Sequence, residues 1–143
     1  MSKDWSNDIA EMHRKFGVHE WFDSNHVNKA LMDKYLRFRL AMCKEELDET
    51  LAAIENKDPE EVVDGLIDLC VFAIGTLDVF GVDANEAWNK VHEANMAKSP
   101  GIKEGRPNPF GLPDLIKPEG WTAPSHNDNH GRLSDALFAD PVQ

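Results

Sequence analysis

Two acidic helical segments joined by a short turn restrict the fold of this chain more than any other feature. The first segment carries Glu45, Glu46 and Glu49, and the second carries Glu61, Asp64 and Asp68. Residues three or four apart on an α-helix lie within about 60° of one another, so each segment presents one acidic edge. Asp58 and Pro59 are typical of a helix start, and they follow the first segment so closely that the two helices must pair antiparallel. The two acidic edges should therefore face one another.

Each of these acidic residues also has an ordinary structural explanation. Glu61 stands three residues after Asp58, as in a capping box. The solvated face of an amphipathic helix commonly carries acidic residues, which would explain Glu45, Glu46 and Glu49. Asp64 and Asp68 fit this explanation poorly, because their helix is apolar on nearly every other face and an unpaired buried carboxylate is costly. A divalent cation would remove that cost, and oxygen-only ligands favour Mg²⁺ or Mn²⁺ over Zn²⁺.

The composition excludes some classes of partner. The chain has 143 residues, enough for one domain, and 15 Lys and Arg against 26 Asp and Glu give a net charge of −11. This charge argues against nonspecific binding to nucleic acid or to an anionic membrane. Cys43 and Cys70 lack the spacing of a disulfide framework, and no apolar run is long enough to span a membrane. We therefore expect a cytoplasmic protein with no nucleic-acid or membrane partner.

Helical periodicity predicts an all-α fold, a four-helix bundle without strands. The expected helices cover residues 4–16, 27–56, 59–80 and 83–98, and residues 18–25 are expected to form a loop because they contain Asp23, Ser24 and Asn25. Residues 1–98 would form the helical domain. Residues 99–143 contain seven of the eight prolines and predict an irregular extension that packs on the bundle or on a neighbouring subunit. The 59–80 helix is apolar on more faces than one layer can cover, which predicts an oligomer.

The acidic edges point to phosphate chemistry, because Mg²⁺ held by carboxylates usually completes its coordination with water and phosphate oxygens. Asn95 and Lys98 lie three residues apart near the end of the last helix, where they would offer an amide and a positive charge to phosphates. Their ordinary explanation is a solvent-facing amide and a lysine that stabilises the helix C-terminus. We keep both as candidate substrate-binding residues.

The segments EELDE, EEVVDGLID and NMAK together resemble the MazG-like all-α NTP pyrophosphatases, whose pattern is ExxE, a short gap, ExxD, and a later Asn and Lys. Glu46 and Glu49 fit the first pair and Glu61 and Asp64 the second. Glu45 and Asp68 occupy further acidic positions found in viral versions. The segments MHRKFG and IKPEGW also resemble small phage-type members, so that the resemblance covers roughly residues 10–121.

This resemblance implies hydrolysis of an NTP or dNTP to the monophosphate and pyrophosphate by a homodimer or homotetramer. The metal ligands would be Glu46, Glu49, Glu61, Asp64 and Asp68. The catalytic residues would be Glu45, Glu46 and Glu49. Asn95 and Lys98 would bind the phosphates. Either Glu45 or Glu49 would accept the proton of the attacking water. The enzyme would act in the cytoplasm, that of a host cell if it is phage-encoded.

Two other functions stay open on the sequence. A phosphoribosyl-ATP pyrophosphohydrolase shares this fold and would need only a different pocket for base and sugar. A noncatalytic helical assembly would bind a cation at the same carboxylates without turning over nucleotide. An oxygen-activating carboxylate bundle is disfavoured, because such sites use Glu-x-x-His pairs and no histidine follows Glu46 or Glu61 at that spacing.

Overall fold

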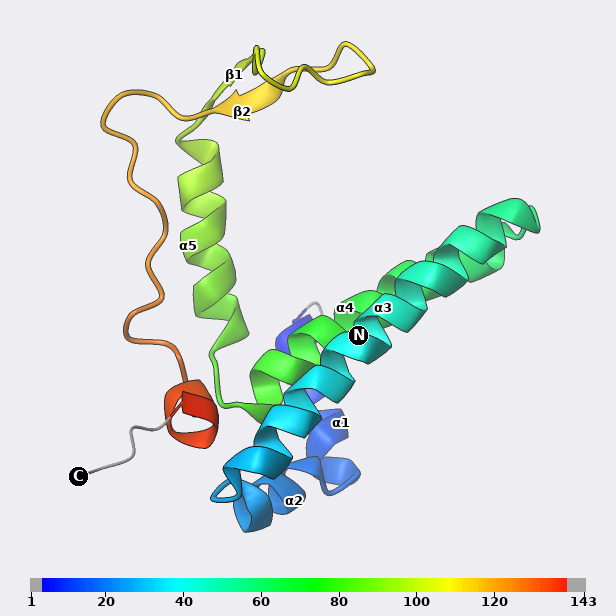
Figure 1. Ribbon diagram of the computed structural model, residues 1–143, viewed down its shortest axis with the longest axis vertical. Helices are drawn as coiled ribbons and strands as arrows, with labels where there is room; N and C mark the ends of the chain where they lie inside the picture. The colour runs from blue at the N-terminus through cyan, green and yellow to red at the C-terminus, as the bar shows by residue number, and fades with distance from the viewer. Residues whose placement is uncertain (1–3, 139–143) are drawn as a thin grey trace. The chain divides into compact units, whose positions relative to one another are not determined.

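The computed structural model describes residues 4–138, and this part of the chain forms two compact units (Figure 1). The first unit contains residues 4–84 and 130–138, and the second contains residues 85–129. Helices build most of the first unit, the second combines one helix with a largely irregular segment, and the only strands among the described residues are two strands of three residues each. The predicted all-α fold class is confirmed.

Four α-helices and one π-helical turn build the first unit. They are α1 (Trp5–Lys15), α2 (Val18–Asn25), α3 (Lys29–Glu55), α4 (Pro59–Val79) and η1 (Ser134–Phe138). The two long helices, α3 and α4, form an antiparallel hairpin (Figure 1). This hairpin carries both acidic edges.

Side-chain caps fix where the helices begin. The side chain of Asp4 accepts from the Asn7 N–H at the start of α1, and that of Asn28 accepts from the Leu31 N–H at the start of α3. At the start of α4 the N–H of Glu61 donates to Asp58 Oδ1 at 3.2 Å. These contacts satisfy backbone donors that a helix end leaves unpaired, which explains why the predicted starts lie close to the observed ones.

Residues 18–25 form α2, so the predicted loop is wrong. Gly17 adopts a left-handed conformation, with φ at 74°, which ends α1 and lets the next helix begin at once. Phe22 is buried in the core and packs edge-to-face against Phe80, with ring centroids 5.4 Å apart. Asn25 lies at the helix end, where its side chain donates to Trp21 O. Tertiary packing therefore outweighs the turn propensity of these residues.

The core of the first unit lies where α2, α3 and α4 meet. It contains Phe22, Met32, Val79 and Phe80, and Ala136 from η1 completes it. The N–H of Arg132 donates to Phe80 O at 2.6 Å, and the Lys29 ammonium donates to Asp135 O. Residues 130–138 therefore return to the helices that the N-terminal half of the chain forms.

The second unit contains α5 (Ala84–Met96) and a small antiparallel ribbon of β1 (Ser99–Gly101) and β2 (Asp114–Ile116), in which Ser99 pairs with Ile116. The sequence predicts no strand here, because three-residue strands among prolines produce no periodic pattern. The Trp121 indole donates to Ala94 O at 2.7 Å, which anchors the following segment to α5. The domain boundary after Lys98 stays a prediction.

No single helix among residues 4–138 is long and apolar enough to cross a membrane, although α4 and α5 taken together meet that criterion by length and composition.

Candidate active site

A buried carboxylate lies on the face of α3 that packs against α4. The buried residues of α3 recur every seven positions and are Met32, Arg39, Glu46 and Ala53. This spacing keeps them on one line along the helix, and the Arg39 side chain donates from that line to Thr76 Oγ1 of α4. Glu46 is only 8 % exposed. It therefore belongs to the packed interface of the hairpin and not to a solvated helix face.

The surroundings of Glu46 favour its protonated form. Burial raises the pKa of the Glu46 carboxyl above its ordinary 4.5, and the negative charges of Glu49, Asp68 and Glu45 raise it further. Among these charges, that of Glu49, three residues away on α3, has the largest effect. Because Asp68 belongs to α4, the structure brings carboxylates of the two helices together.

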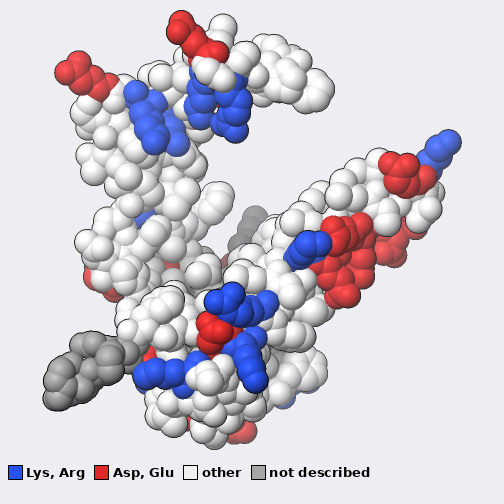
Figure 2. Space-filling view, in the orientation of Figure 1, with Lys and Arg blue, Asp and Glu red and all other residues white. Residues whose placement is uncertain are grey.

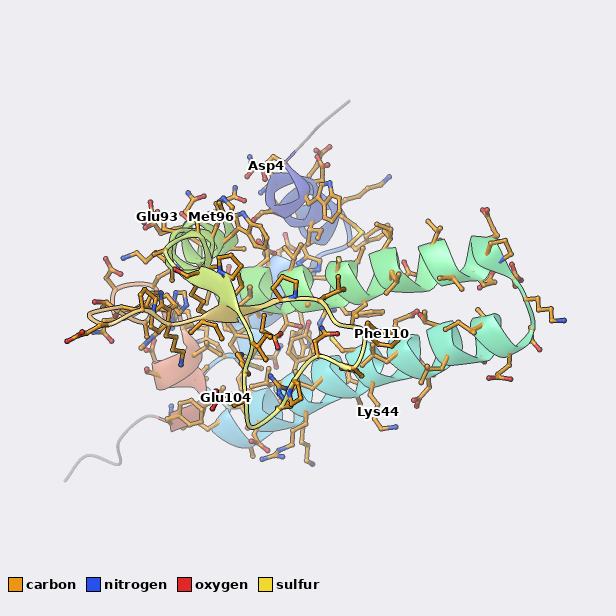
Figure 3. The ribbon with its side chains drawn as sticks, turned by 90° about the horizontal axis from the view of Figure 1, so that it is seen from above. Asp4, Lys44, Glu93, Met96, Glu104 and Phe110 are labelled. Carbon is orange, nitrogen blue, oxygen red and sulfur yellow. The ribbon has the colours of Figure 1, made fainter. Side chains whose placement is uncertain are left out.

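Acidic side chains gather over the hairpin (Figure 2). On the outer side of α3 the sequence instead alternates charge, and Lys44 pairs with Asp48 one turn later at 3.0 Å. Figure 3 shows α3 and α4 side by side, with Lys44 pointing away from α4. The Lys44–Asp48 pair is thus separate from the carboxylates that surround Glu46.

On α4, Glu61 lies three residues before Asp64 and Asp64 lies four residues before Asp68, which places all three on one edge of the helix. Both side chains are exposed, and neither contributes to the pKa shift of Glu46. The backbone N–H of Glu61 donates to Asp58 Oδ1, whereas the Asp58 N–H donates to Ala53 O, so the Glu61 carboxylate does not complete a capping box. Their assignment as metal ligands stays a prediction.

Asn95 and Lys98 belong to the second unit. The Lys98 ammonium lies 5.1 Å from the centroid of the Trp121 ring, and the Lys117 ammonium lies 5.1 Å from the same centroid. An open pocket of about 520 Å³ lies beside them, lined by Lys90, Glu93 and residues 118–124 among others. Asn95 and Lys98 are both half-buried, and their role in binding phosphate stays a prediction.

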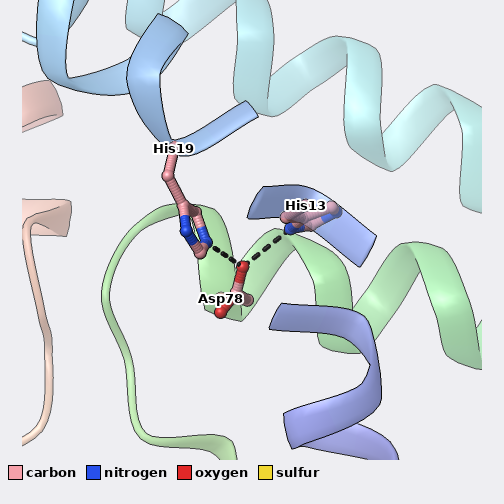
Figure 4. A group of neighbouring side chains, drawn as sticks. All are labelled: His13, His19 and Asp78. Atoms are coloured by element: carbon pink, nitrogen blue, oxygen red, sulfur yellow. Dashed lines mark hydrogen bonds and ion pairs between the residues drawn. The ribbon is translucent and has the colours of Figure 1, made fainter. Parts of the chain in front are cut away.

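The structure reveals a second polar cluster that the sequence analysis missed. His13, His19 and Asp78 meet where α1, α2 and α4 adjoin, with both imidazoles bonded to one carboxylate oxygen (Figure 4). Fifty-nine residues separate His19 from Asp78. The one local signal is the pair of histidines on either side of Gly17, and it is too weak to reveal the third member.

An antiparallel helical hairpin carries an acidic edge on each helix, with one carboxylate buried between the helices. This arrangement fits the MazG-like all-α NTP pyrophosphatases, the superfamily that the sequence motifs resemble. The model of the phosphoribosyl-ATP pyrophosphohydrolase family matches residues 10–95, more than half of the chain, and the chain belongs to this family. Membership indicates a pyrophosphohydrolase that acts on nucleotides. No curated protein matches the chain.

Proposed function

We propose that this protein is a metal-dependent nucleoside triphosphate pyrophosphohydrolase, which cleaves an NTP or dNTP to the monophosphate and pyrophosphate. The main support is Glu46, a carboxylate buried between α3 and α4 with Glu45, Glu49 and Asp68 around it. Like charges gathered in a partly dry interface are unfavourable for stability alone. They become favourable when a polyvalent cation and its phosphate ligand bind there.

The residues present suit Mg²⁺. Every side chain of the cluster offers carboxylate oxygens, which are the ligands that this ion and Mn²⁺ prefer. Burial raises the pKa of Glu46 most and the charges of Glu49, Asp68 and Glu45 raise it further, and a bound cation would offset both effects. Glu46, Glu49 and Asp68 would hold the metal, with Glu61 and Asp64 from the same edge of α4. When bound, Mg²⁺ supplies charge neutralisation for the triphosphate and makes a bound water more acidic.

In the proposed reaction, water attacks the α-phosphorus and the bond from that phosphorus to the bridging oxygen breaks. Pyrophosphate leaves with the bonding electron pair, and the proton of the water passes to a carboxylate. Glu45 and Glu49 are the candidates for this general base, because both are exposed at the margin of the cluster around Glu46. Asn95 and Lys98 would hold the phosphates with an amide and an ammonium group.

A second candidate substrate is phosphoribosyl-ATP, and the family to which the chain belongs favours it. The bond broken would be the same, between the α-phosphorus and the oxygen that bridges to the β-phosphorus. The difference would lie in the pocket that accepts the base and sugar. The carboxylate chemistry of the hairpin would serve either substrate equally well.

We also propose that the active form is a homodimer or homotetramer. The far end of the hairpin exposes apolar side chains on both helices, namely Leu47, Leu51, Ile54, Val63, Leu66 and Ile67, each between 44 % and 63 % exposed. These residues flank the acidic cluster. A second copy that covers them would lower the cost of exposing them to water and would exclude water from the neighbouring carboxylates.

One substrate panel tests these alternatives together. The protein is incubated with Mg²⁺ and each canonical NTP and dNTP, and separately with phosphoribosyl-ATP, and the products are resolved. We expect a monophosphate and pyrophosphate from at least one triphosphate, and in ¹⁸O-labelled water the label should appear in the monophosphate. Turnover of phosphoribosyl-ATP alone would select the second candidate. Release of orthophosphate, or stabilisation by Mg²⁺ without any turnover, would contradict the proposal.

A further inference from the structure

The cluster of His13, His19 and Asp78 brings three metal-ligating atoms to one point. Asp78 Oδ2 lies 2.7 Å from His13 Nδ1 and 2.7 Å from His19 Nε2 (Figure 4). All three atoms lie within 4.8 Å of one another. The two imidazole planes are nearly perpendicular, at 84°, so the rings approach the carboxylate from different directions. Each of the three residues thus offers one ligand atom to a shared position.

The backbone sets up this convergence. Gly17, with φ at 74°, reverses the chain between α1 and α2, so that histidines six residues apart approach the same residue of α4. The ring of His13 lies against Gly75, where an added Cβ would come within 3.1 Å of His13 Cε1. Arg39 also packs on Gly75, but its donors are directed at Thr76 Oγ1 and Phe72 O. The two histidines, and not Arg39, therefore contact Asp78 Oδ2.

We propose that His13, His19 and Asp78 bind a divalent transition-metal ion of the zinc type. Two imidazole nitrogens and one carboxylate oxygen are the donor set that such ions favour, whereas Mg²⁺ prefers oxygen alone. With ligand distances of about 2.0–2.2 Å in a tetrahedral site, neighbouring ligand atoms lie about 3.3–3.6 Å apart, so the contacts of 2.7 Å would open by about 0.6–0.9 Å when an ion binds. His13 is buried and the His19 side chain is 32 % exposed, so an ion can reach the site from one side and keep a free coordination position.

This site is separate from the acidic cluster of the hairpin. Asp68 and Asp78 both belong to α4, and ten residues of α-helix separate them by about 15 Å along the axis. The ligand types also differ, since the hairpin offers only carboxylates. One protein would therefore hold Mg²⁺ and a zinc-type ion at different places. The second ion would link α1 and α2 to the end of α4.

The alternative is a metal-free contact in which Asp78 accepts an N–H from each histidine and only joins the helices. Metal binding differs from it in needing a free lone pair on each ring nitrogen that faces Asp78, so it is measurable as uptake of Zn²⁺ and it weakens at low pH, where protons compete for these nitrogens. A purely structural cluster shows neither effect. It also gives no visible absorption when Co²⁺ is added.

The test is calorimetric titration of the full chain with Zn²⁺, in excess Mg²⁺ to saturate the hairpin, together with the absorption spectrum of the Co²⁺ form. The variants are His19→Gln and Asp78→Asn. His19→Gln is the safer one for folding because that side chain is partly exposed. His92→Gln, which replaces an exposed histidine of α5, and Glu46→Gln are the controls. Circular dichroism checks that each variant is folded.

We expect one Zn²⁺ per chain, and at least about 100-fold weaker binding in His19→Gln and Asp78→Asn, since loss of an outer-shell partner alone already costs about 10–100-fold. Both controls should bind Zn²⁺ as the unmodified protein does, and the thermal midpoint should rise with Zn²⁺ only where binding persists. No binding to the unmodified protein would overturn the proposal. So would unchanged affinity in His19→Gln and Asp78→Asn, or loss of binding in Glu46→Gln.

Discussion

Gly65 of α4 lies directly against Thr50 of α3, so that an added Cβ at position 65 would overlap Thr50 Oγ1. That hydroxyl donates to Glu46 O at 2.7 Å. The contact is thus one turn from the buried Glu46 on α3 and adjacent in sequence to Asp64 on α4. The absence of a side chain at position 65 lets the two helices approach closely at the level of their acidic edges.

Replacing Gly65 with alanine should push α3 and α4 apart. We expect a loss of about 1–3 kcal/mol in the free energy of unfolding, as for overpacking of a tight interface, together with reduced nucleotide turnover. The double variant Gly65→Ala, Thr50→Ala removes the overlapping hydroxyl and should recover much of both. Gly105→Ala is the control, because no atom lies within 4 Å of a Cβ there. Chemical denaturation and a turnover assay measure the two effects, and equal stability of Gly65→Ala and Gly105→Ala would contradict the role of this contact.

The pKa of Glu46 makes stability depend on pH in the absence of metal. Because burial and neighbouring carboxylates raise the pKa above the ordinary 4.5, the folded state holds this proton more tightly than the unfolded state. The stabilisation is present at low pH and is lost as the pH rises from the unfolded pKa through the folded one. In EDTA, the unfolding free energy of the unmodified protein should therefore fall relative to Glu46→Gln over this range.

Denaturation at several pH values between about 4 and 7 measures this difference. Glu11→Gln, at an exposed position of α1, is the control for removing one negative charge. If the unfolding free energies of Glu46→Gln and the unmodified protein differ by the same amount at every pH, Glu46 is not in a crowded, partly dry setting.

Magnesium should reverse the order of stability. The unmodified protein gains RT ln(1 + [L]/Kd) on binding, about 2.7 kcal/mol at a hundredfold excess over Kd, while Glu46→Gln and Asp68→Asn gain much less. Both variants should also hydrolyse little nucleotide. Thermal unfolding with EDTA and with millimolar Mg²⁺ measures the gain. If both variants keep the full response to Mg²⁺ and still turn over nucleotide, these carboxylates are not ligands.

Lys98 and Lys117 provide a matched pair for testing phosphate binding, because both ammonium groups lie at the same distance from Trp121. If Lys98 binds phosphate, Lys98→Ala should weaken substrate binding by about 1–3 kcal/mol, roughly 5- to 150-fold in KM, and leave Mg²⁺ binding nearly unchanged. Lys117→Ala should change KM little. Steady-state kinetics decide whether Lys98 binds phosphate or only packs on Trp121. Equal effects of the two variants on KM would mean that it only packs on Trp121.

The exposed apolar residues of the hairpin predict an oligomer in solution. Light scattering at micromolar concentration should give at least twice the chain mass of 16.1 kDa. Leu51, which is 62 % exposed, is a suitable site for disruption, and Leu51→Glu should shift the protein toward the monomer. Lys44→Glu, on the outer side of α3, changes charge without removing apolar surface. A stable monomer of the unmodified protein would contradict the prediction.

Local signals allowed much of the helical framework to be predicted. The cap at Asp58 acts through a hydrogen bond to Glu61, three positions away, so the sequence predicts the start of α4 directly. The caps at Asp4 and Asn28 are equally local, but it is periodicity that predicts the starts of α1 and α3. The spacing of the acidic residues likewise places Glu45, Glu46 and Glu49 on one edge of a helix without any knowledge of the fold. The short turn at residue 57 then makes the two acidic helices neighbours.

Only tertiary structure decided which of these residues is buried and which distant groups meet. Periodicity cannot show that Glu46 lies on the line of α3 that packs against α4. Acidic and apolar residues both precede and follow it in the sequence, and the neighbouring apolar residue Leu47 is exposed although Glu46 is buried. Residues 18–25 form a helix because Phe22 packs on Phe80, a residue far along the chain. His13, His19 and Asp78 meet for the same reason: long-range packing sets the position of each helix, and no local pattern encodes it.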